Sequence, residues 1–267
     1  MSLSLVWWPY LLPLLQRYES VGQQPDNLCG PYWISLLLQV YGELSLSAVD
    51  VAIAANTVLP NHGDAADWVP SGARPRQGPG YDRIPTCSDR AMCGTSATGL
   101  IRATEHLSQG HFCLLPLQIE DWLTGLRELL ALCLAHPDWQ VIPILNVHTR
   151  HFWGSQLTPL ELFTYLETGQ LIPPPTDWNV GHFALLVGQV RGQAASLYVV
   201  LDTYPHFGEN GLHRQPADAL VRSLQRPHDK TQGGVLLFMK AEVQSQVRAI
   251  LEATGFQITA WDNGSPT

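Results

Sequence analysis

The stretch QQPDNLCGPYWISLLLQVYG, residues 23–42, places one cysteine between a polar, turn-prone segment and an apolar segment with helical spacing. Pro31 suits the first turn of a helix and Gly42 suits its end, so the helix is predicted to begin at Cys29. The amide hydrogens and positive dipole end of a helix start favour a thiolate, which is the nucleophilic form of cysteine. Gly30 leaves the backbone beside the sulfur unobstructed, so a substrate carbonyl can approach closely. Cys29 is therefore a candidate nucleophile.

Nucleophilic catalysis by cysteine also needs an imidazole that holds or moves the proton, and a third group that fixes the imidazole. Of the ten histidines, His182 opens the buried strand pattern GHFALLVGQV, and Gly181 clears space beside it. Asp202 ends the next strand pattern, SLYVVLD, and the intervening RGQAA predicts an antiparallel hairpin. In a hairpin the end of the second strand lies beside the start of the first, so His182 and Asp202 are predicted to be neighbours. Taken singly, each residue also fits a plain role as a strand cap or a turn start.

This set resembles the papain-like cysteine enzymes, and most closely the bacteriocin-processing peptidases with their noncatalytic and acyl-transferring relatives. In that superfamily a glutamine precedes the nucleophile by six residues, CG begins the central helix, and a histidine and then Asp or Asn follow on neighbouring strands. Here Gln23 lies 6 positions before Cys29, followed by CGPYWISLL, VGHFALLVG and VVLDTYP. The resemblance implies that Gln23 and the amide of Cys29 donate to an oxyanion. The alternative is that Gln23 only solvates a loop, because Gln24 stands beside it.

The resemblance covers residues 20–45 and 178–206 and implies a papain-like α+β fold. In that fold the nucleophile stands at the start of a central helix packed on an antiparallel sheet. Leu28 departs from the pattern, because bacteriocin-processing peptidases usually carry Asp at that position. The longer set DNLCG, GTSATGL, DWNVGHF and DTYP is also similar to an uncharacterised bacterial family without an assigned activity.

The order of the remaining patterns, with helices first and strands later, also predicts an α+β layout. Helices are predicted near residues 47–56, 120–135, 158–168, 216–226 and 241–254, and from a cap at Thr95 or Ser96. Buried strands are predicted in HFCLLPL, WQVIPILNV, GHFALLVGQV, SLYVVLD and GGVLLFMK. The amino-terminal apolar segment predicts a short packing helix that buries Leu11, Leu12, Leu14 and Leu15.

We expect one domain over residues 1–267, with a Pro/Gly-rich excursion at 58–94 that lacks periodicity and can fold over a cleft. Tryptophans are expected to shape an apolar substrate groove near the nucleophile, although most of the nine tryptophans are expected in the core. The groove residues predicted from the pattern are Trp33, Trp153 and Trp178.

Three further groups of residues suggest other sites. Cys93 also precedes a predicted helix and is a second conceivable nucleophile, but it lacks a histidine with the same strand-edge placement. Cys87, Cys93 and His62 are spaced too loosely for a structural zinc site. The pair His148 and His151 also suggests a metal site, but it is predicted to mark a loop after a strand. Cys113 and Cys133 are predicted to be core residues.

The amino-acid composition argues against several classes of binding partner. The chain carries 15 basic and 23 acidic residues and no basic cluster, which argues against nucleic acid and anionic membranes. The amino-terminal segment is too short to span a bilayer and is broken by Pro9 and Pro13, so neither membrane insertion nor an export signal is expected. Five cysteines, an odd number, are expected to be free thiols in the cytoplasm. No metal or cofactor is expected, since no nucleotide-binding fingerprint is present.

The sequence therefore predicts a cysteine-dependent hydrolase or acyltransferase that attacks a peptide amide or an acyl thioester through an acyl-enzyme. The alternative is a catalytically silent papain-like module that binds peptides or recognises leader segments. Oligomeric state stays open at this point.

Overall fold

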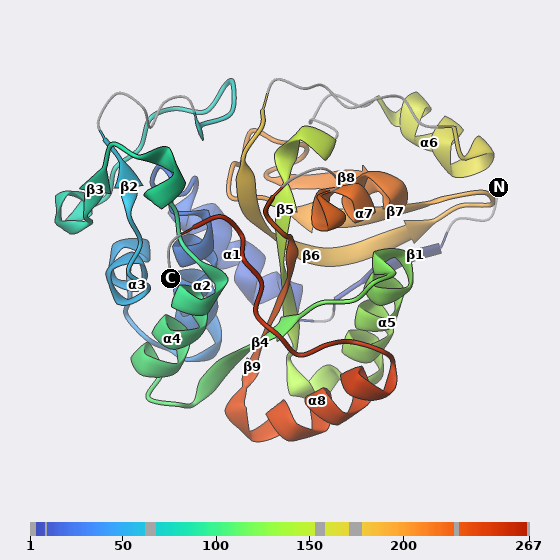
Figure 1. Ribbon diagram of the computed structural model, residues 1–267. Coiled ribbons are helices and arrows are strands. Elements are labelled where there is room, and N and C mark those ends of the chain that lie inside the picture. Colours follow the sequence, from blue (N-terminus) through green and yellow to red (C-terminus); the bar gives the residue numbers. More distant parts are fainter. Residues whose placement is uncertain are drawn as a thin grey trace.

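A seven-stranded antiparallel sheet runs through the described part of the chain (Figure 1). The structure is a computed structural model that describes residues 4–8, 10–61, 68–152, 158–170, 178–226 and 230–265. The strand order is β4-β9-β5-β6-β7-β8, and β1 pairs with β6 beyond the end of β5. The strands are β1 (Ser4–Trp7), β4 (Phe112–Leu117), β5 (Ile142–His148), β6 (Gly181–Arg191), β7 (Ser196–Leu201), β8 (Leu212–Pro216) and β9 (Gly234–Lys240).

Helices cover the sheet from two sides, with α1–α4 gathered at the left of Figure 1, α5–α7 at the right and α8 along the bottom. The α-helices of the described residues are α1 (Leu11–Val21), α2 (Cys29–Tyr41), α3 (Ala48–Ala54), α4 (Ala97–Leu107), α5 (Trp122–Ala135), α6 (Pro159–Thr168), α7 (Ala217–Gln225) and α8 (Gln244–Ala253). The mixed α+β class predicted from the sequence is confirmed.

Helix α2 is the buried centre of the left-hand group, because its residues from Gly30 to Leu38 are all buried. Trp33 stacks on Tyr18 with ring centroids 5.9 Å apart and donates from Nε1 to the carbonyl of Phe183 at 3.0 Å. A Cβ on Gly30 would lie 2.8 Å from Cδ1 of Leu100 and 3.1 Å from Cδ2 of Phe183. The first turn of α2 therefore packs directly between α4 and β6.

Local capping explains where several helices begin. Ser47 and Asp50 form a capping box at the start of α3, and Thr158 and Glu161 form another at α6. Ser96, rather than Thr95, caps α4 by accepting from the amide of Gly99 at 3.0 Å.

The predicted helices and strands are present. The differences concern the burial of one leucine and two strands that were not expected. Leu11 and Leu14 are buried in α1 and Leu15 is half-buried, but the prediction for Leu12 was wrong, because its side chain is 65% exposed. Strands β1 and β8 were not predicted. Within β8, LHRQP carries two charged or titratable side chains, so it lacks the apolar run that marked the other strands.

The excursion at 58–94 contains more structure than the expected aperiodic loop. Its ends meet in the parallel pair β2 (Leu59–Pro60) and β3 (Thr86–Cys87) and in a bridge between Val58 and Gly94. The 3₁₀ turn Tyr81–Arg83 lies between β2 and β3, and the 3₁₀ turn Arg90–Met92 lies between β3 and Gly94. Residues 62–67 of this segment lie outside the described residues.

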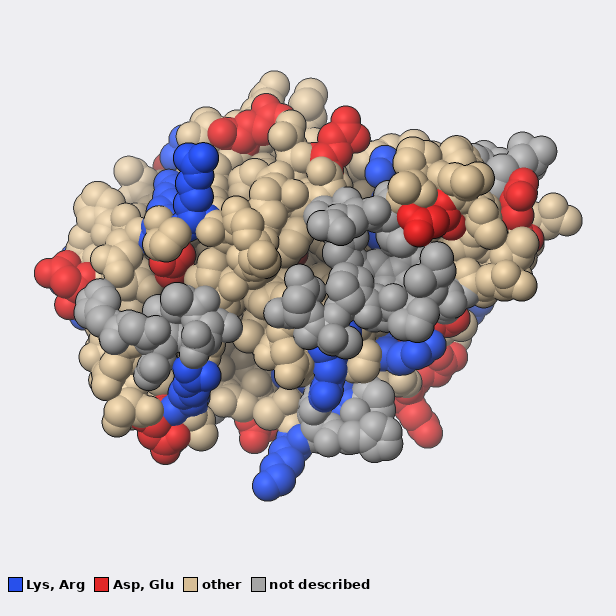
Figure 2. All heavy atoms as spheres, turned by 90° about the horizontal axis from the view of Figure 1, so that it is seen from above, with Lys and Arg blue, Asp and Glu red and all other residues tan. Residues whose placement is uncertain are grey.

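No described helix reaches the length and apolarity that crossing a membrane requires. On the face shown in Figure 2, basic and acidic side chains are interspersed over a mostly uncharged surface.

We expect Gly30→Ala to lower the free energy of unfolding by about 1–3 kcal/mol, because the added methyl group overpacks the contact of α2 with α4 and β6. Urea denaturation measures this change. Gly181→Ala is the matched control: a Cβ there would lie 3.9 Å from the nearest Arg226 atoms, so its effect should stay within about 0.5 kcal/mol. Equal effects of the two substitutions would contradict the packing argument.

Candidate active site

The structure brings Cys29, His182 and Asp202 together, although they come from three separate elements. Cys29 is the first residue of α2, His182 is the second residue of β6, and Asp202 directly follows β7. Nε2 of His182 lies 3.1 Å from Oδ1 of Asp202, as the hairpin of β6 and β7 predicts. Cys29 lies near enough to His182 to raise the pKa of the imidazole. Because Nε2 is committed to Asp202, Nδ1 is the ring nitrogen left for the thiol.

Hydrogen bonds tie the segment before Cys29 to the segment after Asp202. The amide of Gln24 donates to the carbonyl of Thr203 at 3.1 Å, and Nε2 of Gln24 donates to the hydroxyl of Tyr204 at 3.0 Å. Together with the bond between Trp33 and Phe183, these contacts fix the start of α2 against β6 and the end of β7.

The 58–94 excursion braces the same segment from the other side. Asp26 and Arg76 exchange two bonds, from the Asp26 amide to the Arg76 carbonyl at 2.8 Å and from the Arg76 amide to Asp26 Oδ2 at 3.0 Å. The hydroxyl of Tyr81 donates to the carbonyl of Asp26 at 2.8 Å. The excursion therefore supports the loop that carries the candidate nucleophile.

Asp202 and His182 are both buried, but their surroundings favour an ionised carboxylate and a protonated imidazole. Asp202 has no exposed surface and His182 is 2% exposed. Burial by itself lowers the pKa of His182, but the charge and hydrogen bond of Asp202, followed by those of Cys29, raise that pKa to about 10. Burial raises the pKa of Asp202, but His182 and then His213 outweigh it and hold that pKa well below its usual range. The arrangement thus favours an imidazolium between a carboxylate and a thiol.

A second histidine reaches the same carboxylate and was missed by the sequence analysis. Nε2 of His213 lies 3.3 Å from Oδ2 of Asp202, and its Nδ1 lies 2.7 Å from Nε2 of Gln215. His213 and Gln215 stand two positions apart on β8 and so share one face of the strand. If this segment had been recognised as a strand, the two-residue spacing would have predicted that His213 and Gln215 lie on the same face.

Aromatic rings enclose His182. The ring centroid of Trp178 lies 4.9 Å from that of His182, and the ring of Tyr204 stacks at 6.0 Å. Nε1 of Trp178 donates to the carbonyl of Trp68 at 3.1 Å, which anchors the indole to the excursion. These rings exclude water from the bond between His182 and Asp202, and a lower local dielectric strengthens that bond.

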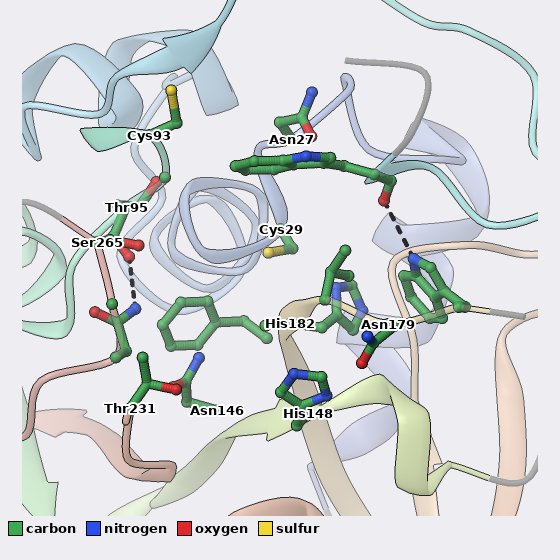
Figure 3. Close-up of a pocket in the computed structure, with 18 of the residues that line it drawn as sticks. Asn27, Cys29, Cys93, Thr95, Asn146, His148, Asn179, His182, Thr231 and Ser265 are labelled. Carbon is green, nitrogen blue, oxygen red and sulfur yellow. Dashed lines mark hydrogen bonds between the residues drawn. The ribbon is translucent and has the colours of Figure 1, made fainter. Parts of the chain in front are cut away.

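A cavity of about 350 Å³ opens beside these residues, and the sulfur of Cys29 projects into it (Figure 3). Trp178 and Gly181 line this cavity, as predicted. Amide and hydroxyl side chains form much of the remaining wall, namely Asn27, Thr95, Asn146, Asn179, Thr231 and Ser265. The cavity is thus large enough for a small acyl group, and its lining, which also includes Arg90 and Arg226, is polar rather than a purely apolar groove.

Two predicted substrate-binding residues are corrected by the structure. Trp33 is fully buried in the core, and Gly30 is occupied with helix packing, so neither is part of the cavity wall. The apolar spacing around Cys29 marks a helix that is buried all round, and such a helix turns its aromatic residues into the core. Trp153 lies outside the described residues.

The structure favours Gln24 over Gln23 as the amide beside the nucleophile. Nε2 of Gln23 donates to the carbonyl of Arg74 at 2.6 Å, and Gln23 is absent from the described cavity wall. Gln24 is 2% exposed, lines the cavity, and has an Oε1 atom without a hydrogen-bond partner. Its Nε2 carries two hydrogens, of which one is used by Tyr204. The prediction from the six-residue spacing therefore shifts by one position.

The competing cysteine sites are less suited to catalysis. Cys93 lines the same cavity, but it is buried and its sulfur contacts the carbonyls of Asp89 at 3.3 Å and Cys87 at 3.6 Å. Burial raises the pKa of Cys113 to about 11 and raises that of Cys133 still further. No disulfide joins any of the five cysteines, which all lie in described segments.

The histidines and cysteines considered above as metal ligands do not form a metal site in the described part of the chain. The ring centroids of His148, which ends β5, and His151, in the 3₁₀ turn that follows, lie 6.4 Å apart, so only His151 lies after the strand as predicted. Within the described segments no cluster of three or more potential metal ligands occurs. His62 lies outside them.

Comparison with known proteins places the chain in a family. Residues 8–262 match the model of a family of unknown function, DUF6885. The chain belongs to DUF6885. No curated protein matches the sequence significantly. The matched range includes the whole candidate site of this DUF6885 protein, from Gln24 to His213, but the family description assigns it no reaction.

The buried pair predicts a particular pH dependence of stability. The pKa of Asp202 is below its unfolded value of about 3.9, so its contribution is present above that pH and is lost as the pH falls. The pKa of His182 rises from 6.5 to about 10, so its contribution is complete below pH 6.5 and is lost as the pH rises toward 10. We expect the difference in unfolding free energy between wild type and Asp202→Asn to be largest between about pH 4 and 6.5.

Urea denaturation from pH 3 to pH 9 measures this difference. Asp121→Asn is the control, because Asp121 is an exposed cap of α5 whose hydrogen bonds to Thr124 lower its pKa, so its effect should stay level above pH 6.5. A stabilising effect of Asp202 that grows between pH 6.5 and 9 would contradict the assignment.

Proposed function

We propose that this DUF6885 protein is a cysteine-dependent hydrolase or acyltransferase that attacks an amide or thioester carbonyl and forms an acyl-enzyme. One observation carries the proposal: the buried hydrogen bond between His182 and Asp202 adjoins a helix-start cysteine at the wall of a cavity. Nucleophile, base and orienting group are then in the order that acyl transfer requires.

In the first half-reaction the Cys29 thiolate attacks the substrate carbonyl carbon, a C–S bond forms, and the carbonyl π electrons move to oxygen. The amide of Cys29, at the first position of α2, and Nε2 of Gln24 are the donors proposed for this oxyanion. The His182 imidazolium then protonates the leaving amine or thiol as the carbonyl re-forms and the bond to the leaving group breaks.

In the second half-reaction neutral His182 removes a proton from the acceptor, which adds to the thioester carbonyl. Collapse of this intermediate breaks the C–S bond, and the imidazolium and the thiolate are restored. Water as the acceptor gives hydrolysis, and an amine gives acyl transfer. The substrates proposed are peptides and acyl thioesters, since both contain the required carbonyl and suit a cavity lined by amides and hydroxyls.

The cysteines also agree with the compartment proposed from the sequence. No disulfide occurs among them, and a thiol nucleophile depends on staying reduced. We therefore propose that the protein works in the reducing cytoplasm.

We expect Cys29 to react with iodoacetamide at pH 6 at least about tenfold faster than Cys113, because the start of α2 and the neighbouring His182 favour negative charge on its sulfur, whereas burial raises the pKa of Cys113 to about 11. Alkylation between pH 5 and 9 followed by peptide mapping measures both rates in one sample. His182→Ala should return Cys29 to ordinary reactivity, and Cys93→Ala is the matched control that should leave it unchanged. If Cys29 reacts no faster than Cys113, the enzyme proposal is wrong and a silent binding module is the better description.

A second prediction separates the two glutamines. With a peptide or acyl thioester that wild type turns over and Cys29→Ala does not, we expect Gln24→Ala to lower kcat about 10²-fold, because one oxyanion donor is removed. Gln23→Ala should have an effect within about threefold, since its amide is bonded to Arg74. The reverse order of effects would restore the six-residue spacing as the correct guide.

A further inference from the structure

Asp202 is held by a histidine on each carboxylate oxygen, and the proposed mechanism uses only one of them. Oδ1 faces His182, and Oδ2 faces Nε2 of His213 at 3.3 Å. His213 is 5% exposed, and Gln215 behind it has no exposed surface. Hydrogen bonds therefore join Gln215, His213, Asp202 and His182 in turn, from β8 to the cavity that His182 and Cys29 both line.

The orientation of Gln215 fixes the tautomer of His213. Nε2 of Gln215 can only donate, so Nδ1 of His213 must accept at their 2.7 Å contact. A neutral imidazole that accepts at Nδ1 carries its proton on Nε2. That proton points at Oδ2 of Asp202 and gives the carboxylate a buried donor.

We propose that His213 is a positioning residue that orients Asp202 and keeps it ionised, so that His182 retains its proton while Cys29 is a thiolate. This role rests on the proposed function. A carboxylate with no exposed surface needs donors to both oxygens, since an unsatisfied buried charge is costly. His213 acts through Asp202 and does not touch the substrate carbonyl.

Other titratable groups near Asp202 do not explain such an effect. Tyr18 of α1 and Tyr204 both face this carboxylate, and burial, chiefly, raises the pKa of each phenol far above neutrality. His182 and His213 are the groups that lower the pKa of Asp202, and Cys29 acts on His182. The ring of His213 also packs near the rings of Phe152 and Phe207, with centroids 5.5 Å and 6.1 Å away.

The contacts with Phe152 and Phe207 define the alternative, in which His213 only fills space. His213→Leu fills that space with an apolar side chain and removes the N–H donor to Asp202. His213→Gln keeps an N–H donor. Gln215→Leu leaves His213 in place and removes the group that fixes its tautomer. His206→Ala is the matched control, because His206 is an exposed histidine of the same region that packs on Tyr204 and Phe207.

The experiment is the pH profile of Cys29 alkylation by iodoacetamide in the full chain, with far-ultraviolet circular dichroism as the check on folding. We expect His213→Leu to move the acid limb upward by about one pH unit, which makes alkylation on that limb about tenfold slower. Gln215→Leu should move it in the same direction by less, His213→Gln should restore part of the wild-type profile, and His206→Ala should match wild type.

The outcomes separate this proposal from the function on which it rests. Profiles of His213→Leu and Gln215→Leu that coincide with wild type overturn the role of His213 and leave the enzyme proposal intact. If His213→Leu does not fold, the Gln215→Leu profile decides in the same way. A wild-type Cys29 that reacts only as an ordinary thiol overturns the proposed function, and the role of His213 with it.

Discussion

The ionised carboxylate of Asp202, buried without any exposed surface, is the constraint on which the rest of the site depends. A charge in this position is tolerated only where the surrounding donors replace the water that it has lost. The donors come from the loop after β7 and from two other strands, through the amide of Tyr204 at 3.1 Å, His182 of β6 and His213 of β8. Holding the charge therefore requires three strands to be in register, and this requirement links the stability of the sheet to the chemistry at its edge.

Tight packing and the hydrogen bonds of neighbouring residues together set the position of Cys29. Helix α2 approaches β6 closely because Gly30 lacks a side chain, and Trp33 locks that approach with its bond to the carbonyl of Phe183. Phe183 directly follows His182, so the backbone position that anchors the helix also places the imidazole. Core residues around α2 thus have a catalytic consequence in the proposed mechanism without contacting a substrate.

The excursion at 58–94 gives the site its outer support. Its bonds with Asp26 hold the loop before Cys29, and its contact with Trp178 holds the ring that shields His182. A segment with little regular structure can do this because its backbone groups bond to the loop they support. In the proposed function, the same segment limits the access of water and substrate.

Patterns local to a few residues were sufficient for much of this fold. The helix beginning at Cys29, the hairpin of β6 and β7, and the adjacency of His182 and Asp202 follow from periodicity, turn residues and strand pairing, all of which depend on near neighbours in the chain. Pattern reasoning failed at β8, because HRQ has the polarity of a loop and becomes a buried strand only beside Asp202.

The tertiary structure alone decided which candidate side chains face the cavity. Gln23 and Gln24 are equivalent by type and nearly so by spacing, and their roles separate only because Arg74 takes one amide and Tyr204 the other. Trp33 and Trp178 are likewise indistinguishable as tryptophans, but one faces the core and the other faces His182. The sequence determined which chemical groups are available and where helices and strands begin. Long-range packing determined their direction, because the direction of a side chain depends on contacts between residues that lie far apart in the chain.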